Sequence, residues 1–408
     1  MLKLKISIVC FSAILLTVSC ANEKKNSPVS LAPKPSTIEQ TASNDSLIQE
    51  FALLIEDSMY EGDSKSYLSR FDFERFMDFV TYSQNPELDN QRFAAGFRTG
   101  MGEGIKSLPE KISQTTANGG YYDYINYSYD EDAKTYTVLF RLFSDQEGLN
   151  YHKYQLAKFN EKIHFEDIYV YATGEKLSET SRKLFFASLP KNILQKIIHR
   201  EDAPDMEHLI NASTHIKSGQ YTMAFDNLKK VEGRLKNERI FHVLKITTAA
   251  QLSDEEYIQA LTEMKNTFGN DPTMNLLSID YHFLKGEYDK AMESVDNLEA
   301  STGDNFLDFY RGNIYQYKGD HENAIAFYDK VIENYPDYYN ASLNQLVSYS
   351  YIGKFDECVT ILEKLTSEDF FPEDLISYVE DPGLEETSIL QPLMDSKDYQ
   401  TWKTSVSK

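Results

Sequence analysis

Two different spacings of apolar residues divide this chain of 408 residues. From Asp45 onwards, apolar side chains recur at every third or fourth position, which predicts amphipathic helices. Between residues 121 and 171 they alternate with polar ones in segments rich in Tyr, Phe, Val and Ile, which predicts strands. The predicted strands are Tyr121–Tyr129, Thr135–Phe143, Leu149–Phe159 and His164–Tyr171, with turn residues between them. A helical spacing returns from Leu177 to about His199. Helices before and after four consecutive strands predict that residues 45–200 form an α+β module with an antiparallel meander.

The rest of the chain also has a helical spacing, and there it repeats with a fixed period. Gly219, Gly286, Gly319 and Gly353 are separated by 67, 33 and 34 residues, so the first gap holds two periods, with Ser253 in the middle place. A period near 34 is typical of arrays of helix–turn–helix repeats. Five units fit, at about 205–238, 239–271, 272–304, 305–338 and 339–371. Residues 372–408 should form an irregular helical cap over the open end of the array.

The unit at 305–338 resembles the tetratricopeptide repeat (TPR). The resemblance is carried by Gly312 and Tyr315 in the first helix, Gly319 and Asp320 at the turn, Ala324 and Tyr328 in the second helix, and Pro336 after it. The small residues Gly312 and Ala324 allow the two helices of a pair to approach closely. In the fifth unit Cys358 takes the place of Ala324, so we expect Cys358 to be a small buried residue.

The resemblance to TPR proteins implies a concave groove, lined by the first helix of each pair, that binds a peptide or a helix of a partner. At the matching positions the predicted groove residues are mostly aromatic and neutral: Phe306, Phe309, Asn313, Gln316, Tyr317, Leu343, Val347 and Tyr351. Because this set lacks Lys and Arg, a clamp for the C-terminal carboxylate of a partner is not expected. Alternatively, several of these aromatic side chains pack into the core against the 45–200 module or the cap.

The N-terminus has the form of a signal peptide. Lys3 and Lys5 precede an apolar run of 13 residues from Ile6 to Val18, and the small residue Ser19 follows it. A spanning helix needs roughly 20 apolar residues, so we expect a cleaved signal and not a stable membrane helix.

The end of this segment, LLTVSC, resembles the lipoprotein box of bacteria. In that family the Cys becomes the first residue of the mature chain and carries lipid, which implies a signal peptide over residues 1–19 and lipidation of Cys20. Thr17 stands where the family usually has Leu, and the alternative is an ordinary secretory signal that contains a Cys. Residues 20–44 would then hold the lipidated Cys and a flexible tether, because the segment is rich in Ser, Pro, Lys, Asn and Thr.

The order of elements in the 45–200 module, helices followed by a curved meander, resembles the NTF2-like, or cystatin-like, α+β cone. The resemblance implies a pocket between the sheet and the long helix, where an Asp or His serves as general base in enzyme members. Candidates here are His152, Tyr154, His164 and Asp167, all on predicted strands. Alternatively, the histidines are solvated or bonded to a cross-strand partner and Asp167 caps the end of a ladder. No two of the four form a recognised catalytic spacing, which favours this alternative.

Composition narrows the function further. The chain carries 64 acidic and 41 basic residues, a net charge of -23, which argues against binding of nucleic acid. Removal of the signal peptide takes away Lys3 and Lys5 and makes the net charge -25. With three Cys, of which one lies in the signal and one is the lipidation site, structural disulfides are not expected. Motifs for phosphate binding, metal ligation or nucleophilic catalysis are missing from the sequence, so we expect no metal and no cofactor.

We therefore expect a multidomain protein, an NTF2-like α+β cone followed by an all-α TPR solenoid. The function we predict is non-enzymatic. We expect a lipid-anchored protein of the bacterial cell envelope, on the periplasmic or outer face of the outer membrane. It would mediate protein–protein interaction or complex assembly. The alternative is a small-ligand carrier, or an enzyme of hydrolase or isomerase type, that uses the pocket of the NTF2-like module.

Overall fold

A computed structural model of the chain describes residues 33–82, 91–145, 148–187, 203–269, 274–368, 370–381 and 389–407. The predicted signal peptide, Cys20 and most of the predicted tether lie outside these ranges. The chain divides into two compact units, one that ends at Tyr281 and one that runs from His282 to Lys408. The division falls within a helix of the third predicted repeat.

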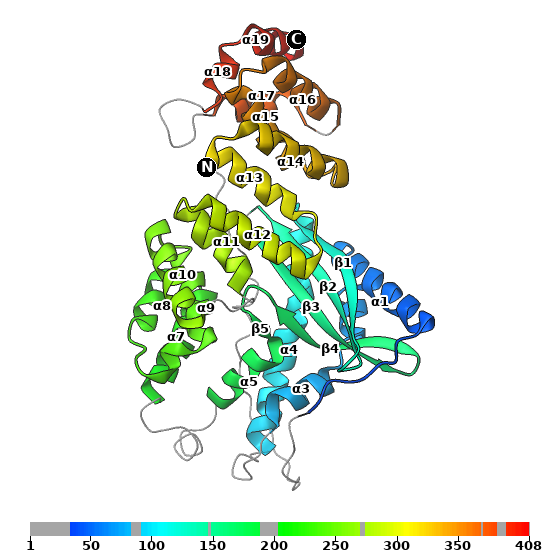
Figure 1. Cartoon of the computed structure of the whole chain (residues 1–408). Coiled ribbons are helices and arrows are strands. Elements are labelled where there is room, and N and C mark those ends of the chain that lie inside the picture. The colour runs from blue at the N-terminus through cyan, green and yellow to red at the C-terminus, as the bar shows by residue number, and fades with distance from the viewer. Residues whose placement is uncertain are drawn as a thin grey trace. The chain divides into compact units, whose positions relative to one another are not determined.

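A five-stranded antiparallel sheet with the strand order β1-β2-β3-β4-β5 forms the centre of the first unit (Figure 1). Its strands are β1 (Tyr121–Asp130), β2 (Thr135–Ser144), β3 (Gly148–Phe159), β4 (Lys162–Val170) and β5 (Glu175–Lys176). The four predicted strands and their meander are confirmed, and β5 is a short addition that pairs with Tyr169 and Val170 at the end of β4. The reversal between β3 and β4 is tight, because Asn160 and Glu161 both have positive φ.

In the sequence, helices both precede and follow the strands of the sheet. They are α1 (Ala42–Tyr60), α2 (Ser64–Ser69), α3 (Phe73–Thr81) and α4 (Gln91–Ala117) before the sheet, and α5 (Leu177–Ala187) after it. Helix α1 begins three residues earlier than predicted, because the Thr41 hydroxyl accepts a hydrogen bond from the backbone N–H of Asn44 and caps the first turn. The predicted continuation of α5 to about His199 lies outside the described residues.

Aromatic side chains fill the space between the sheet and the first helices. Phe165 of β4 lies at the centre, with ring centroids 5.2 Å from Tyr67 of α2 and 4.8 Å from Tyr154 of β3. Phe140 of β2 stacks on Tyr122 of β1 at 5.2 Å. All five rings are buried. The interior of the module is therefore a packed aromatic core.

Residues 33–41, which we call the strap, lie against the module instead of belonging to the tether. The backbone N–H and the hydroxyl of Ser36 donate to the two carboxylate oxygens of buried Glu166, at 2.8 and 2.7 Å. The N–H of buried Ile38 donates to the carbonyl of Lys134 at 2.9 Å. Because these contacts satisfy polar groups and bury an apolar side chain, the module extends to about residue 33. The predicted tether is therefore left with residues 21–32.

Within the described residues, the helices after α5 form five successive pairs that match the five predicted units. The pairs are α7 (Ala203–Lys217) with α8 (Tyr221–Leu228), α9 (Arg239–Ala249) with α10 (Asp254–Phe268), α11 (Asn275–Leu284) with α12 (Tyr288–Thr302), α13 (Leu307–Lys318) with α14 (His321–Asn334), and α15 (Tyr339–Tyr351) with α16 (Phe355–Glu368). A short 3₁₀ helix, η3 (Arg234–Asn237), precedes α9.

The periodic glycines have a common conformational role. Gly219, Gly286, Gly319 and Gly353 follow the first helix of their pairs and all have φ between 68° and 81°. This left-handed conformation ends a helix at little cost only in glycine, which explains the period seen in the sequence. Ser253 instead has φ of -162° and caps α10 by accepting from the N–H of Glu256. The second pair therefore turns without a glycine.

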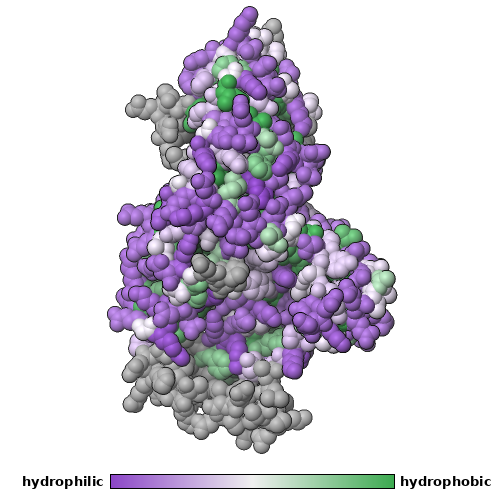
Figure 2. Space-filling model, in the orientation of Figure 1, coloured by the Kyte–Doolittle hydropathy of each residue, from purple (hydrophilic) through white to green (hydrophobic). Residues whose placement is uncertain are grey.

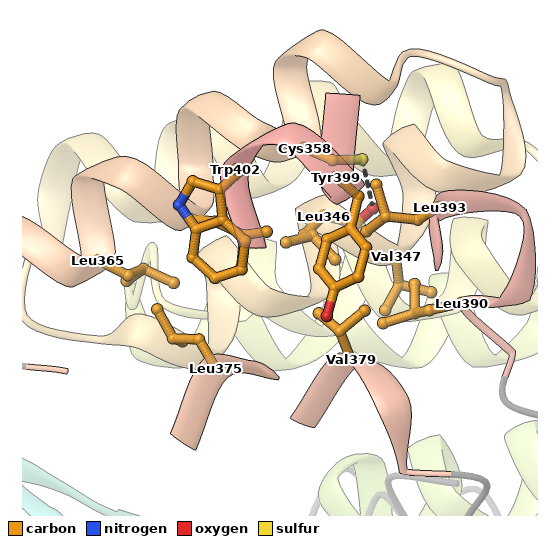
Figure 3. Packing of buried hydrophobic residues seen from close by; sticks show 11 residues of the cluster. Leu346, Val347, Cys358, Leu365, Leu375, Val379, Leu390, Leu393, Tyr399 and Trp402 are labelled. Atoms are coloured by element: carbon orange, nitrogen blue, oxygen red, sulfur yellow. Dashed lines mark hydrogen bonds between the residues drawn. The ribbon is translucent and has the colours of Figure 1, made fainter. Parts of the chain in front are cut away.

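A helical cap closes the last pair, as predicted. It consists of α17 (Pro372–Glu380), α18 (Gln391–Met394) and α19 (Lys397–Val406). Trp402 and Tyr399 of α19 lie in one buried cluster with Leu346 of α15 and Cys358 of α16 (Figure 3). The Cys358 thiol donates to the carbonyl of Leu346 at 3.4 Å, which confirms the prediction of a small buried residue.

Candidate functional site

Four of the eight predicted groove residues are buried in the second unit. Phe306 and Phe309 pack against Tyr338, with ring centroids 5.1 and 4.9 Å apart, and Val347 belongs to the cluster under the cap. These side chains fill the space between consecutive helix pairs, where a stacked repeat buries its apolar face. Phe306 and Phe309 are therefore core residues, although they pack between repeats and not against the 45–200 module or the cap. Val347 is the member of the set that packs with the cap.

The polar members of the predicted groove connect two neighbouring helix pairs. The Asn313 side-chain oxygen accepts from the Tyr328 hydroxyl at 2.8 Å and from the Asn344 amide at 2.9 Å. The Gln316 amide donates to the Asn344 carbonyl at 2.7 Å and to the Ser348 hydroxyl at 2.9 Å. Buried polar groups need such partners, so Asn313 joins α13, α14 and α15 instead of facing a ligand.

Tyr317 and Tyr351 are the predicted groove residues that are exposed, with 39% and 55% of their surface accessible. They occupy equivalent positions, 34 residues apart, each two residues before a glycine of positive φ. Phe283, another 34 residues before Tyr317, holds the Tyr317 ring edge to face at 4.8 Å. We call Phe283, Tyr317 and Tyr351 the aromatic row. Leu343, the remaining predicted residue, is partly buried against the cluster under the cap.

The surroundings of the aromatic row are polar. His321 stacks on one side of the Tyr351 ring, with centroids 4.6 Å apart and planes 8° from parallel. Lys318, next to Tyr317, pairs with Asp289 of α12 at 2.7 Å. Partial burial, followed by the charges of Tyr288 and Tyr351, raises the pKa of Tyr317 above its ordinary value, so the hydroxyl stays protonated. Tyr317 and Tyr351 thus offer neutral aromatic faces, each with a hydroxyl group at its rim.

Exposed hydrophobic residues are scattered on the surface of the described part of the chain. On the face shown in Figure 2, hydrophilic residues cover most of the described surface and hydrophobic ones are scattered between them. Large exposed apolar side chains in the described second unit are Tyr317, Tyr351, Phe371 and Ile389. Of these, Tyr317 and Tyr351 lie at matching positions of neighbouring repeats. None of the described helices is both long and apolar enough to span a membrane.

Two of the four candidate catalytic residues lie inside the aromatic core of the first unit. The hydroxyl of Tyr154 is 3.0 Å from that of Tyr67 and 2.7 Å from that of Tyr122. Nδ1 of His152 is 3.2 Å from the Tyr122 hydroxyl, and its Nε2 is 3.4 Å from the Asn150 amide. Burial lowers the pKa of His152 to about 3, so the imidazole is neutral at pH 7. The structure brings these groups together as one enclosed chain of hydrogen-bonding side chains.

Asp167 and His164 are separate from that chain. Asp167 accepts from the backbone N–H and the hydroxyl of Ser178, at 3.1 and 2.5 Å, and so caps the first turn of α5. Burial raises the pKa of Asp167 to about 6 despite these hydrogen bonds. His164 stacks on Phe159 of the neighbouring strand at 3.6 Å. The stacking of His164 on a neighbouring strand agrees with the alternative of a cross-strand partner. Asp167 differs from that alternative, because it caps a helix and not the end of a ladder.

A polar cluster at the edge strand β1 was not predicted from the sequence. The Tyr60 hydroxyl of α1 accepts from the N–H of Tyr122 at 3.2 Å and donates to Asp123 at 2.7 Å. Asp123 also pairs with Arg141 across the sheet. Glu56, one turn before Tyr60, accepts from the N–H of Tyr124, and burial, followed by the charge of Asp123, raises the pKa of Glu56 to about 7. The end of α1 thus covers outward N–H groups of an edge strand, a role that has no local sequence signal.

Comparison with known proteins identifies one segment. Residues 307–338, which comprise α13 and α14, match the family model of the tetratricopeptide repeat. A search of curated proteins with the whole chain finds no match. The match agrees with the repeat resemblance of this unit, and the helical pairs around it fit the same architecture. TPR domains generally bind protein partners, so the match suggests protein–protein interaction.

Proposed function

We propose that this chain is a non-enzymatic binding protein of the bacterial cell envelope, whose helical repeats hold a segment of a partner protein. The observation that carries the proposal is the aromatic row. Tyr317 and Tyr351 are exposed at matching places on consecutive first helices, within and next to the segment that matches a TPR. Exposed aromatic side chains on a rigid scaffold lose little conformational entropy on binding and bury a large area, as interface anchors do.

The scaffold under the row supports this role. Gln316, Asn313 and Asn344 lock α13 to α15 by direct hydrogen bonds, so the two tyrosines are held at a fixed separation. The cap buries the apolar end of the array through Trp402 and Tyr399. A partner would therefore meet a preorganised surface, which lowers the entropy cost of association.

The N-terminal part of the proposal is a lipid anchor on Cys20. Residues 21–32 would separate the anchor from the strap, and a chain of that length reaches at most about 45 Å. A tether this short confines the protein near one membrane and raises its effective concentration for partners there. Labelling with a radioactive or clickable palmitate tests the anchor. Wild type should be labelled and Cys20→Ala should not, and equal labelling of the two would remove the anchor from the account.

For the α+β module we propose a structural and positioning role. This proposal is supported by the aromatic core between the sheet and the first helices, where Tyr67, Tyr122, Tyr154 and Phe165 are all buried. The hydrogen bonds between Ser36 of the strap and Glu166 support a positioning role, because the strap follows the proposed tether directly in the chain. The repeat array would then be the partner-binding part.

Affinity purification from the native envelope tests the binding proposal. We expect at least one protein to co-purify with wild type and to be lost from the double variant Tyr317→Ala/Tyr351→Ala. Phe371→Ala removes an aromatic ring with 73% exposure elsewhere in the same unit, so it is the matched control and should retain the partner. If the double variant recovers the same proteins as wild type, the aromatic row is not the binding site.

A further inference from the structure

The geometry of the aromatic row restricts the conformation of a partner segment, an inference that rests on the proposed function. Helices α13 and α15, which carry Tyr317 and Tyr351, are direct neighbours because the Gln316 amide reaches the Asn344 carbonyl at 2.7 Å. Directly packed helices lie about 8–10 Å apart. Tyr317 and Tyr351 occupy equivalent positions on these two helices, so we expect their rings to be spaced about as the helices are. Two side chains of a partner must then be about 8–10 Å apart if each is to lie on one ring.

Among regular conformations, polyproline II matches this spacing best. It has three residues per turn and rises about 3.1 Å per residue, so side chains three positions apart point to one side at about 9 Å. Side chains on one face of a β-strand are about 7 Å apart. On one face of an α-helix, successive turns are about 5.4 Å apart. The row therefore favours an extended segment of the polyproline II type.

The charge of the second unit indicates which side chains the segment carries. Residues 282–408 contain ten Lys and Arg against 25 Asp and Glu, a net charge of -15. Residues 4–281 carry only -9 over more than twice that length. Close to the row, the exposed residues Glu322 and Asp356 lie in the first turns of α14 and α16, which follow the two tyrosines. Such a surface attracts cations and repels acidic segments.

Tyrosine faces and an acidic surface together suit the guanidinium group. A cation over an aromatic ring is attracted by the negative face of the ring, and Arg is the cation most often found there. One side of the Tyr351 ring is occupied by His321, yet 55% of the residue stays exposed. Burial lowers the pKa of His321, so the imidazole is neutral at pH 7 and does not repel a cation.

We propose that the aromatic row binds an extended cationic segment of a partner protein, in polyproline II conformation, with an Arg at every third position. One guanidinium would lie over Tyr317 and the next over Tyr351. Phe283, the buried member of the row, supports the Tyr317 ring by its edge-to-face contact.

Fluorescence anisotropy with the full chain in detergent tests the proposal with two labelled peptides. The peptides (Arg-Pro-Pro)4 and (Glu-Pro-Pro)4 share a backbone conformation and differ in charge. The Arg peptide should bind, more weakly as salt is raised, and the Glu peptide should not. Tyr317→Ala and Tyr351→Ala should each weaken the Arg peptide roughly two- to five-fold, and the double variant by about the product. Phe371→Ala removes an exposed ring outside the row, so this control should bind as wild type does.

Three results would each overturn this inference: equal binding of the two peptides, unchanged affinity of the double variant for the Arg peptide, or absence of binding by the Arg peptide. If a partner is nevertheless lost from the double variant in affinity purification, the proposed function stands and only the cationic segment is wrong. Thermal melting of each variant, monitored by circular dichroism, separates loss of the ring from loss of folding.

Discussion

The ring of Tyr328 lies against the backbone of Gly312, so close that a Cβ on Gly312 would be 2.5 Å from Cε1 of the ring. Gly312 is in the middle of α13 and Tyr328 in the middle of α14, and the glycine lets the two helices of this pair approach. The Tyr328 hydroxyl then donates to Asn313, which in turn accepts from Asn344 of the next pair. Gly312 thus allows the close approach of α13 and α14, and through Tyr328 it also affects the hydrogen bonds to the next helix pair.

We predict that Gly312→Ala destabilises the array. Overpacking costs about 1–3 kcal/mol, and a Cβ contact of 2.5 Å belongs to the upper part of that range. The better helix propensity of Ala returns at most about 1 kcal/mol, so the free energy of unfolding should fall by about 1–2 kcal/mol. Gly102→Ala in α4 is the matched control, because its Cβ would lie 3.5 Å from Phe73, an ordinary contact. Chemical denaturation should show the control neutral or slightly stabilised. An unchanged stability of Gly312→Ala would mean that Tyr328 moves away easily.

The strap provides a second prediction. Ser36→Ala removes one of the two hydrogen bonds that Ser36 donates to buried Glu166, and hydrogen bonds to charged groups are worth about 1.5–3 kcal/mol. We expect the strap to detach more often and limited proteolysis within residues 33–41 to become at least several-fold faster. Ser46→Ala is the control, because Ser46 is an exposed residue of α1, and it should be cleaved at the wild-type rate. Equal cleavage of all three proteins would show that Glu166 does not hold the strap.

The buried imidazole of His152 predicts a dependence of stability on pH. Its pKa is lowered to about 3 by burial, whereas an unfolded His has an ordinary pKa near 6.5. Below pH 6.5 the unfolded chain therefore binds a proton that the folded one does not. The stabilising contribution is complete above pH 6.5 and is lost as pH falls towards 3, by up to about 1.4 kcal/mol per pH unit. Asp167, with its pKa raised to about 6 from 3.8, acts in the opposite sense between those values.

Comparison with His152→Gln isolates this contribution. Between pH 6.5 and 5, wild type should lose about 2 kcal/mol more than the variant in the free energy of unfolding. In NMR spectra of the wild type, the ring carbons of His152 should keep their neutral chemical shifts down to pH 5. A normal titration of the ring near pH 6.5 would contradict the enclosed position of His152.

Cys358 should be chemically inert in the folded protein. Burial raises the pKa of its thiol to about 12, and its side chain lies under the cap beside Leu346. Because the thiolate is the reactive form, iodoacetamide at pH 8 should leave Cys358 unmodified for hours and alkylate it promptly in urea. Mass spectrometry of tryptic peptides locates the label. Fast alkylation without denaturant would indicate that the cap over α16 opens.

The repeat architecture could be predicted from the sequence because its signals are local. A left-handed turn favours glycine, so Gly319 is visible in the sequence as one of the glycines with a period near 34. A close helix crossing requires a small residue, which is how Gly312 contributes to the TPR resemblance of its unit. The strands were visible for the same reason, since alternation and turn residues act within a few positions.

The exposed part of the candidate site could not be separated from the core by sequence. Phe306 and Tyr317 are both aromatic and on the same helical unit, yet Phe306 is enclosed by Tyr335 and Tyr338 of the following turn while Tyr317 stays exposed. Which ring is covered depends on the neighbouring helix pair. The strap was missed because Ser36 and Glu166 are 130 residues apart and a polar segment without apolar periodicity resembles a tether.

Photocross-linking in the native envelope tests the central claim, that exposed tyrosines of the repeat array hold a partner protein. A photoreactive amino acid at position 351 should form one reproducible covalent product with a protein. The same amino acid at position 371, which is more exposed in the same unit, should not form it. The product at 351 should disappear when Tyr317→Ala is added. Absence of a product at 351, or the same products at 351 and 371, would contradict the claim.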